Sequence, residues 1–256
     1  IIDSGLSHLR SQEDPEASQA SLYDLAHASS AYAIAESFLD YAANGPEESQ
    51  IVETFVADVL RSVAAITFGS ERAWGLDDSD LKIVREYVTD HGTPKMYAQA
   101  SQMSGESHLS DDMELVAQTF RRFGYDHIID LAEKVHREDL DVPESIISGL
   151  AALGCFGLSI PLEYGGSASG SSQDMHGMVI ATEELSRASL SIGGSLITRP
   201  EILARAIENG GTEKQKKDLL PGIASGELMS AVAVTEPDYG SDVASITMTA
   251  RQGSND

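Results

Sequence analysis

The residues best suited to chemistry lie late in the sequence, where the apolar run 228–234 leads directly into TEPDYGSD at 235–242. The run has no helical period and is rich in small and β-branched residues, which is typical of a buried strand. At the end of such a strand, the backbone amides of Val234 and Thr235 and the Thr235 hydroxyl can point at one edge of a ligand. Preorganised donors of this kind stabilise negative charge that develops on a bound group. We therefore expect a ligand site where this strand ends.

The turn after this strand adds a glycine and a second hydroxyl. Gly240 permits close approach of the backbone to a ligand, and Ser241 supplies the hydroxyl. The two carboxylates, Glu236 and Asp242, are not predicted to be catalytic, and we expect them to accept hydrogen bonds from backbone amides at the turn. The alternative interpretation is an ordinary strand followed by a Pro-Gly turn.

Most of the remaining sequence is predicted to be helical. Residues 51–66 place their apolar side chains on one wide stripe after Pro46, a residue suited to a first helical turn. Trp74 is predicted to be a packing anchor for this first helical region, and the polar stretch 101–110 reads as a linker. Further helices are predicted from Asp77 to a point before His91, from Asp111 to Val135, from Pro143 to Leu153, over 174–187, over 189–209, and from a Thr212–Gln215 capping box to Pro221.

A second strand is predicted at 246–250, returning from the turn. Two strands do not form a stable sheet alone, so we expect the sequence to be a segment of a longer protein.

Composition limits the classes of partner. The formal net charge is −24, from 41 acidic and 17 basic residues, which disfavours nucleic acid and anionic membranes as partners. No apolar run approaches the ~20 residues of a membrane span. One cysteine, Cys155, allows no internal disulfide, and the histidines show no zinc signature, so no metal is expected. We expect a cytoplasmic enzyme, or a mitochondrial-matrix enzyme in a eukaryote.

Three ordered motifs carry a resemblance to a known family. TEPDYGSD at 235–242 resembles the Thr-Glu-Pro-x-x-Gly-Ser-Asp signature of flavin-dependent acyl-CoA dehydrogenases. GGTEKQKK at 210–217, followed by Leu220-Pro221, matches the family's preceding helix, and IPLEYGG at 160–166 matches its Ile-Pro-x-x-Tyr-Gly-Gly loop. The resemblance covers roughly residues 111–256.

The resemblance implies a fold, a cofactor and a reaction. The expected fold class is mainly α, with a helical-bundle N-terminal region followed by the first strands of a β-barrel domain. The cofactor would be FAD, with Val232, Ala233, Val234 and Thr235 along the flavin ring, and Gly240 and Ser241 near the pyrophosphate. Ser241 would also contact the CoA substrate. The reaction would be α,β-dehydrogenation of an acyl-CoA thioester.

The catalytic base of the family lies far downstream, beyond residue 256, so the resemblance assigns no catalytic residue in this sequence. It also implies an electron-transfer flavoprotein as electron acceptor and a homo-oligomer.

Arg199 is the other candidate site residue. It lies in the helix that, by resemblance, forms one wall of the acyl pocket, and an apolar helix does not accommodate an arginine without a partner. One interpretation is a bidentate pair with a second carboxylate on a dicarboxylic acyl-CoA. The other, ranked slightly ahead, is an ion pair with Glu183, Glu184 or Glu201, or a solvated side chain.

The resemblance divides the sequence into three domains: a helical extension at 1–107, an N-terminal helical domain at 108–227, and the first strands of the middle β domain at 228–256. A helical extension occurs in some larger relatives, among them the 2-methylsuccinyl-CoA dehydrogenases, which favours a branched dicarboxylic substrate. Two other functions stay open: a flavin-dependent oxidase or monooxygenase on the same scaffold, and a non-catalytic helical docking subunit.

Overall fold

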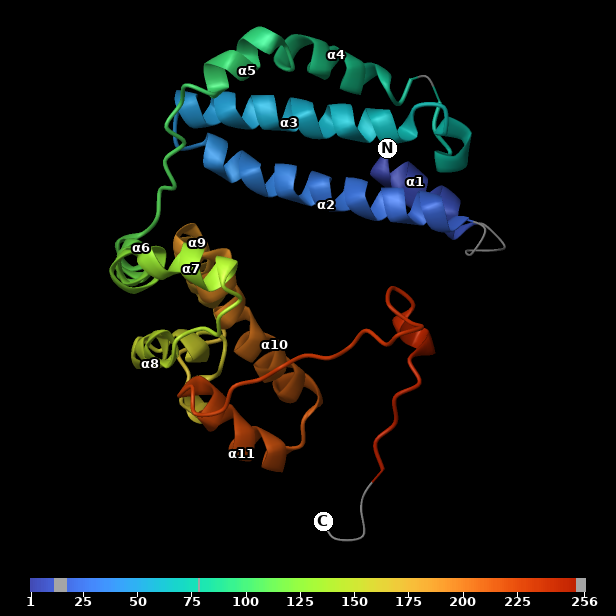
Figure 1. Cartoon of the computed structure of the whole chain (residues 1–256). Helices are drawn as coiled ribbons and strands as arrows, with labels where there is room; N and C mark the ends of the chain where they lie inside the picture. The colour runs from blue at the N-terminus through green and yellow to red at the C-terminus, as the bar shows by residue number, and fades with distance from the viewer. Residues whose placement is uncertain (12–17, 78, 252–256) are drawn as a thin grey trace. The chain divides into compact units, whose positions relative to one another are not determined.

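The computed structural model describes residues 1–11, 18–77 and 79–251, without the side chains of residues 172, 173 and 199 (Figure 1). These residues form two compact units, Ile1–His108 and a second unit from Leu109 onward. Both units are built from helices, so the prediction of a mainly α fold is confirmed.

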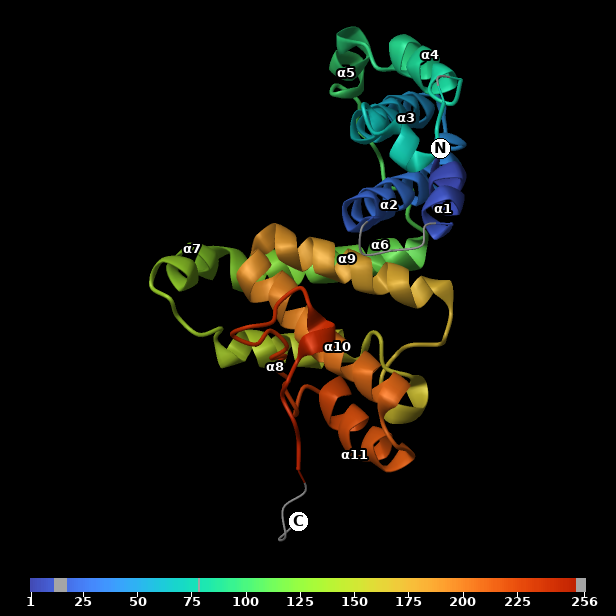
Figure 2. The ribbon, with the colours of Figure 1, turned by 90° about the vertical axis from the view of Figure 1, so that its right-hand side faces the viewer.

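The first unit is a row of helices. They are α1 (Ile2–Arg10), α2 (Gln19–Ala42), α3 (Pro46–Thr67), α4 (Lys82–His91) and α5 (Pro94–Ala100), with a 3-10 turn at Glu71–Trp74. Helix α3 begins at Pro46 as predicted, and it lies between α2 and α4 (Figures 1 and 2). Helix α4 begins at Lys82, later than predicted, because Asp77 and Asp80 hydrogen-bond to amides of the preceding turn.

Trp74 anchors the core of the first unit, as predicted. Its side chain is 1% exposed and packs with Leu9, Leu25 and Val63. A Cβ at Gly5 would lie 2.9 Å from the indole, so α1 approaches the ring closely only because residue 5 is glycine.

The second unit surrounds a separate apolar core. Its helices are α6 (Asp111–Phe123), α7 (Ile129–Arg137), α8 (Glu144–Ala152), α9 (Ser172–Ala188), α10 (Ser195–Gly210) and α11 (Glu213–Ala224). Helices α6 and α9 lie side by side, with α10 and α11 following (Figure 2). Ile128, Leu150, Leu185 and Ile192 are fully buried in this core. Cys155 is buried there too, which raises the pKa of its thiol to about 12 and keeps it protonated.

Two of the predicted helices contain π-helical turns. The helix predicted from Asp111 to Val135 has one at Gly124–Ile128, and the helix predicted over 189–209 begins with another at Leu190–Gly194. Each turn includes a glycine in close contact with α9: a Cβ at Gly124 would lie 2.9 Å from the Ala188 Cβ, and one at Gly193 would lie 2.6 Å from the Leu185 carbonyl oxygen.

The capping box at Thr212 and Gln215 is confirmed, but the predicted end of that helix is wrong. Helix α11 continues through Pro221 to Ala224. Its last turn stays helical because Leu220, Ile223 and Ala224 are buried in one cluster with Ile160 and Ala204. Burial of this turn outweighs the one hydrogen bond that Pro221 cannot donate.

The two strands predicted at 228–235 and 246–250 are the main correction to the expected fold. Within the described part of the chain, neither segment pairs in a β-ladder, and residues 228–235 have no regular secondary structure. Their apolar side chains are exposed, with Val232 at 51% and Met248 at 75%. A strand needs a neighbouring strand as partner for its backbone hydrogen bonds. An isolated pair of strands is only marginally stable, so these two segments do not form a sheet by themselves.

Across residues 1–11, 18–77 and 79–251, no helix is long and apolar enough to cross a membrane.

Candidate functional site

The predicted ligand-binding segment, Val232–Thr235, presents its backbone to solvent. All four residues are exposed. Within the described part of the chain, the amides of Val232, Ala233, Val234 and Thr235 donate no hydrogen bond. The segment therefore presents four backbone donors that make no hydrogen bond among the described residues, and their role in holding an electron-accepting group stays a prediction.

A tight turn follows this segment and brings Gly240 back to Thr235. The Glu236 amide donates to the Tyr239 carbonyl at 2.9 Å, and the Tyr239 amide donates back to the Glu236 carbonyl at 3.3 Å. A Cβ at Gly240 would lie 3.7 Å from the Thr235 Cγ2. The Thr235 side chain and the glycine therefore lie together at one end of the segment, with Ser241 exposed directly after them.

Glu236 connects the turn to the returning segment. Its carboxylate accepts hydrogen bonds from the Thr247 amide (2.9 Å), the Thr247 hydroxyl (2.8 Å) and the Met248 amide (2.7 Å). These bonds, led by that of the Thr247 amide, lower the pKa of the Glu236 carboxyl. We expected amides of the turn itself as partners. The carboxylate instead fixes the position of a segment eleven residues away, which local spacing does not reveal.

Replacing Glu236 with alanine is expected to release that segment without unfolding the second unit. Because two amides lose a charged acceptor, their hydrogen exchange should accelerate about tenfold. Amide exchange of Thr247 and Met248, followed by NMR, measures this. The control is Asp238→Ala, an exposed residue of the same turn, which should leave both rates unchanged. Equal exchange rates in the two variants would contradict the assigned role.

The IPLEYGG loop folds back on itself and packs against α11. The Ala168 amide donates to the Ile160 carbonyl at 3.0 Å, and the Ser167 amide donates to the Gly157 carbonyl at 2.9 Å. A Cβ at Gly166 would lie 2.0 Å from the Ile160 carbonyl oxygen, a distance no side chain tolerates. Gly165 instead has a φ of +84°, in the left-handed region that favours glycine. The two glycines of the motif are therefore required for different reasons.

Arg199 lies in α10, next to the buried Pro200, and its side chain lies outside the described residues. Its predicted partners can be assessed separately. Glu201 forms an ion pair with Arg205. Glu183 forms one with Arg187 at 3.4 Å, and Glu184 forms one with Arg121 at 2.6 Å. Each of the three carboxylates that the sequence offers to Arg199 thus has another arginine.

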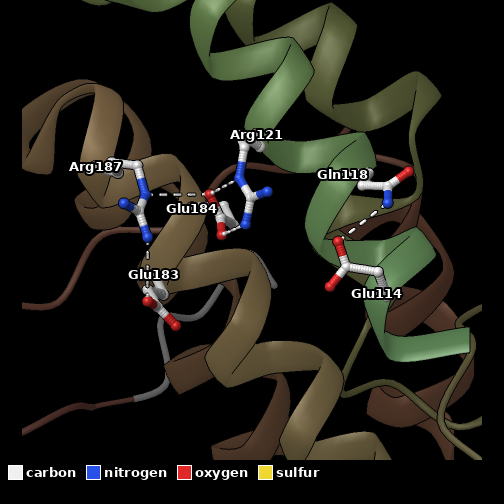
Figure 3. A network of polar contacts seen from close by, with 6 residues as sticks. All are labelled: Glu114, Gln118, Arg121, Glu183, Glu184 and Arg187. Carbon is white, nitrogen blue, oxygen red and sulfur yellow. Dashed lines mark hydrogen bonds and ion pairs between the residues drawn. The ribbon is translucent and has the colours of Figure 1, made fainter. Parts of the chain in front are cut away.

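The Glu184 network was not predicted from the sequence (Figure 3). The Glu184 side chain is 4% exposed. Its carboxylate accepts two hydrogen bonds from Arg121 of α6, one from Nε at 3.0 Å and one from Nη2 at 2.6 Å. Arg187 Nε lies 3.3 Å from the same carboxylate. The spacing of Glu184 and Arg187 indicates their local pair, but nothing local indicates Arg121, which is 63 residues away. This network joins α6 to α9 next to both π-helical turns.

Replacing Arg121 with alanine is expected to lower the free energy of unfolding of the second unit by about 2 kcal/mol. Removing one partner of a buried ion pair typically costs ~3–5 kcal/mol. The loss here is smaller because Arg187 stays beside Glu184 and the Arg121 side chain is 41% exposed. Urea denaturation measures the change. Arg137→Ala breaks an exposed pair with Glu133 and should cost less than ~0.5 kcal/mol. Similar losses in both variants would contradict this assignment.

The same pair predicts a pH dependence. The hydrogen bonds from Arg121 lower the pKa of the Glu184 carboxyl below that of an unfolded glutamate. The ionised carboxylate therefore adds stability above the unfolded pKa, and this stability is lost as the pH falls through the folded pKa. The difference in unfolding free energy between wild type and Arg121→Ala should shrink below about pH 4. A difference that stays constant down to pH 2 would show that the charge is not its source.

Comparison with known proteins agrees with this architecture. Residues 110–227 match the family described as "Acyl-CoA dehydrogenase, N-terminal domain". This match extends from α6 to α11 in the second unit.

Individual proteins that are similar to this chain are also named as dehydrogenases of acyl-CoA thioesters. The (2S)-methylsuccinyl-CoA dehydrogenase of Cereibacter sphaeroides is 41% identical over 142 residues, which are 56% of this chain and 25% of that protein. The mitochondrial isovaleryl-CoA dehydrogenase of Pongo abelii is 32% identical over 148 residues, 57% of this chain and 34% of that protein.

A solved glutaryl-coenzyme A dehydrogenase in complex with glutaryl-CoA is similar at a TM-score of 0.50 and 31% identity, covering 56% of this chain and 35% of its own. The chain thus spans about a quarter to a third of the length of these relatives.

Proposed function

We propose that this chain is part of an FAD-dependent acyl-CoA dehydrogenase that oxidises the Cα–Cβ bond of an acyl-CoA thioester. The observation that carries the proposal is the 41% identity to a (2S)-methylsuccinyl-CoA dehydrogenase over 142 residues. The TEPDYGSD segment, with its free amides, supports it independently of that protein's name.

The residues present fit a flavin. The amides of Val232 to Thr235 and the Thr235 hydroxyl are donors without an acceptor of their own in the described part of the chain, suited to the acceptor edge of an isoalloxazine ring. Gly240 adds no side chain beside Thr235 and allows close approach of a pyrophosphate, and the Ser241 hydroxyl is exposed toward either phosphate or CoA. When bound, FAD supplies the site that takes the hydride from Cβ. Removal of the α-proton is assigned to a carboxylate outside residues 1–256.

The substrate proposed is a short branched or dicarboxylic acyl-CoA such as 2-methylsuccinyl-CoA, with Arg199 binding the distal carboxylate. The support is indirect. Glu183, Glu184 and Glu201 each form an ion pair with another arginine, and the solvated or ion-paired Arg199 stays the alternative. The names of the (2S)-methylsuccinyl-CoA dehydrogenase and the glutaryl-coenzyme A dehydrogenase reported above both refer to dicarboxylic acyl groups. An electron-transfer flavoprotein as acceptor and a homo-oligomeric assembly complete the proposal.

Anaerobic reduction tests the reaction class. The full-length protein, purified with its flavin, is expected to lose its absorbance near 450 nm when 2-methylsuccinyl-CoA is added without oxygen, and to recover it slowly in air. Rapid reoxidation by air would indicate the oxidase or monooxygenase instead. A bound flavin that no acyl-CoA thioester bleaches would contradict the proposed activity.

A further inference from the structure

The first unit contains an apolar groove of about 510 Å³ along its middle helix. Residues of α3 form its floor, and residues of α2 and α4 line it on either side. Figure 1 shows α3 between these two helices. The floor consists of Val56, Val59, Leu60 and Val63. On the sides, Leu39 is 57% exposed and Ile83 is 75% exposed. Ile1, Ile2 and Asp3, at the start of α1, complete the lining, and the apolar side chains along α3 line a groove that is open to solvent.

The edge of the groove is acidic. Asp3, Glu36 and Asp80 line it, and its described lining includes no lysine, arginine or histidine. Within the described part of the chain, none of these three carboxylates forms an ion pair. Glu36 accepts a hydrogen bond from the Tyr32 hydroxyl at 3.3 Å, and the Asp80 carboxylate accepts one from the Asp77 amide. The charge of Glu36, with a smaller effect from Asp3, raises the pKa of the Tyr32 hydroxyl.

This charge selects among possible occupants. Acyl-CoA and FAD are anions, so the groove is a poor second site for either. A second copy of this chain, at a net charge of −24, would bring further negative charge to the same place. An amphipathic helix with basic flanks satisfies both features, because its apolar stripe can lie along α3 while lysine or arginine meets the carboxylates. We propose that this groove binds such a helix from a partner protein, and this proposal does not depend on the flavin chemistry.

Fluorescence anisotropy with a labelled probe peptide tests the proposal on the 256-residue chain. The probe is a helical peptide with leucine at i, i+3, i+4 and i+7 and lysine beside the stripe. Binding is expected to be saturable and weakened by salt. Ile83→Glu should weaken it about tenfold or more, because a charge then enters the apolar contact. Ile34 is also an exposed isoleucine, but it lies on α2 outside the groove. Ile34→Glu should therefore change the affinity for the peptide less than twofold.

The charged edge is tested in the same assay. Glu36→Gln should weaken binding about threefold, whereas Asp40→Asn, on the same helix but outside the lining, should have no effect. The same peptide with glutamate in place of lysine should not bind. Equal binding of the glutamate peptide, equal losses in the Ile83 and Ile34 variants, or a dimer of the chain that Ile83→Glu dissociates in sedimentation would each overturn the proposal.

Discussion

Replacing Arg199 with alanine is expected to lower kcat/KM for 2-methylsuccinyl-CoA about 100-fold, while kcat/KM for 2-methylbutyryl-CoA changes less than threefold. The two thioesters differ only in the distal group, a carboxylate in the first and a methyl in the second. A guanidinium that binds a desolvated carboxylate through two hydrogen bonds contributes several kcal/mol, and its removal leaves the substrate charge without a partner. Steady-state kinetics of the full-length enzyme measures both ratios.

Two further variants control this experiment. Arg199→Lys keeps the charge but loses the bidentate geometry, so an intermediate loss of about tenfold is expected on the dicarboxylic substrate. Arg205→Ala removes an arginine of the same helix that already pairs with Glu201, and it should not separate the two substrates. Equal losses on both thioesters in Arg199→Ala would show that Arg199 supports the fold rather than the substrate.

Replacing Gly166 with alanine is expected to destabilise the second unit by about 3 kcal/mol. The new methyl group would meet the Ile160 carbonyl oxygen at 2.0 Å and the Ile160 Cβ at 2.6 Å, and backbone offers no rotamer that relieves the overlap. The hydrogen bond from the Ala168 amide to the Ile160 carbonyl must break for the variant to fold. Urea denaturation measures the loss.

Gly165→Ala is the matched control for that variant. A Cβ at Gly165 meets no atom within 4 Å, so the substitution costs only the strain of a left-handed alanine, about 1 kcal/mol. The neighbouring glycines should therefore differ by about 2 kcal/mol. If the two losses are equal, the close approach at residue 166 does not exist in solution.

The sequence predicted the parts of this fold that depend on neighbours along the chain. The start of α3 at Pro46 and the Thr212–Gln215 cap each rest on groups a few residues apart, and both are confirmed. The burial of Trp74 also agrees, because a large aromatic side chain in a helical unit has few stable positions outside the core.

The features that the sequence did not predict depend on contacts between residues far apart in the chain. The π-helical turns follow from glycine contacts between helices, and the helix through Pro221 follows from burial of Ile223 and Ala224. The Arg121–Glu184 pair joins two helices whose register is set only by packing. The strand at 228–235 was predicted from its composition, but strand formation needs a neighbouring strand, and among the described residues this segment pairs with none.

The candidate ligand-binding segment has features of both kinds, some predicted from nearby residues and some set by distant ones. Val232–Thr235 and Gly240 are predicted as site residues from the strand end, the motif and its resemblance, and the sequence also indicates that Gly240 would allow close approach. The bonds from the Glu236 carboxylate to Thr247 and Met248 required the structure, because they cross eleven and twelve residues of loop. Assignment of this segment to a flavin stays a prediction.

A flavin titration tests the central claim most directly. The full-length protein, stripped of small molecules under mild conditions and mixed with excess FAD, is expected to retain a yellow flavin after gel filtration and to melt at a higher temperature. Substituting proline for Val234 removes one of the proposed amide donors and should weaken retention at least tenfold. A wild-type protein that elutes colourless, with an unchanged melting temperature, would contradict the claim that these amides hold a flavin.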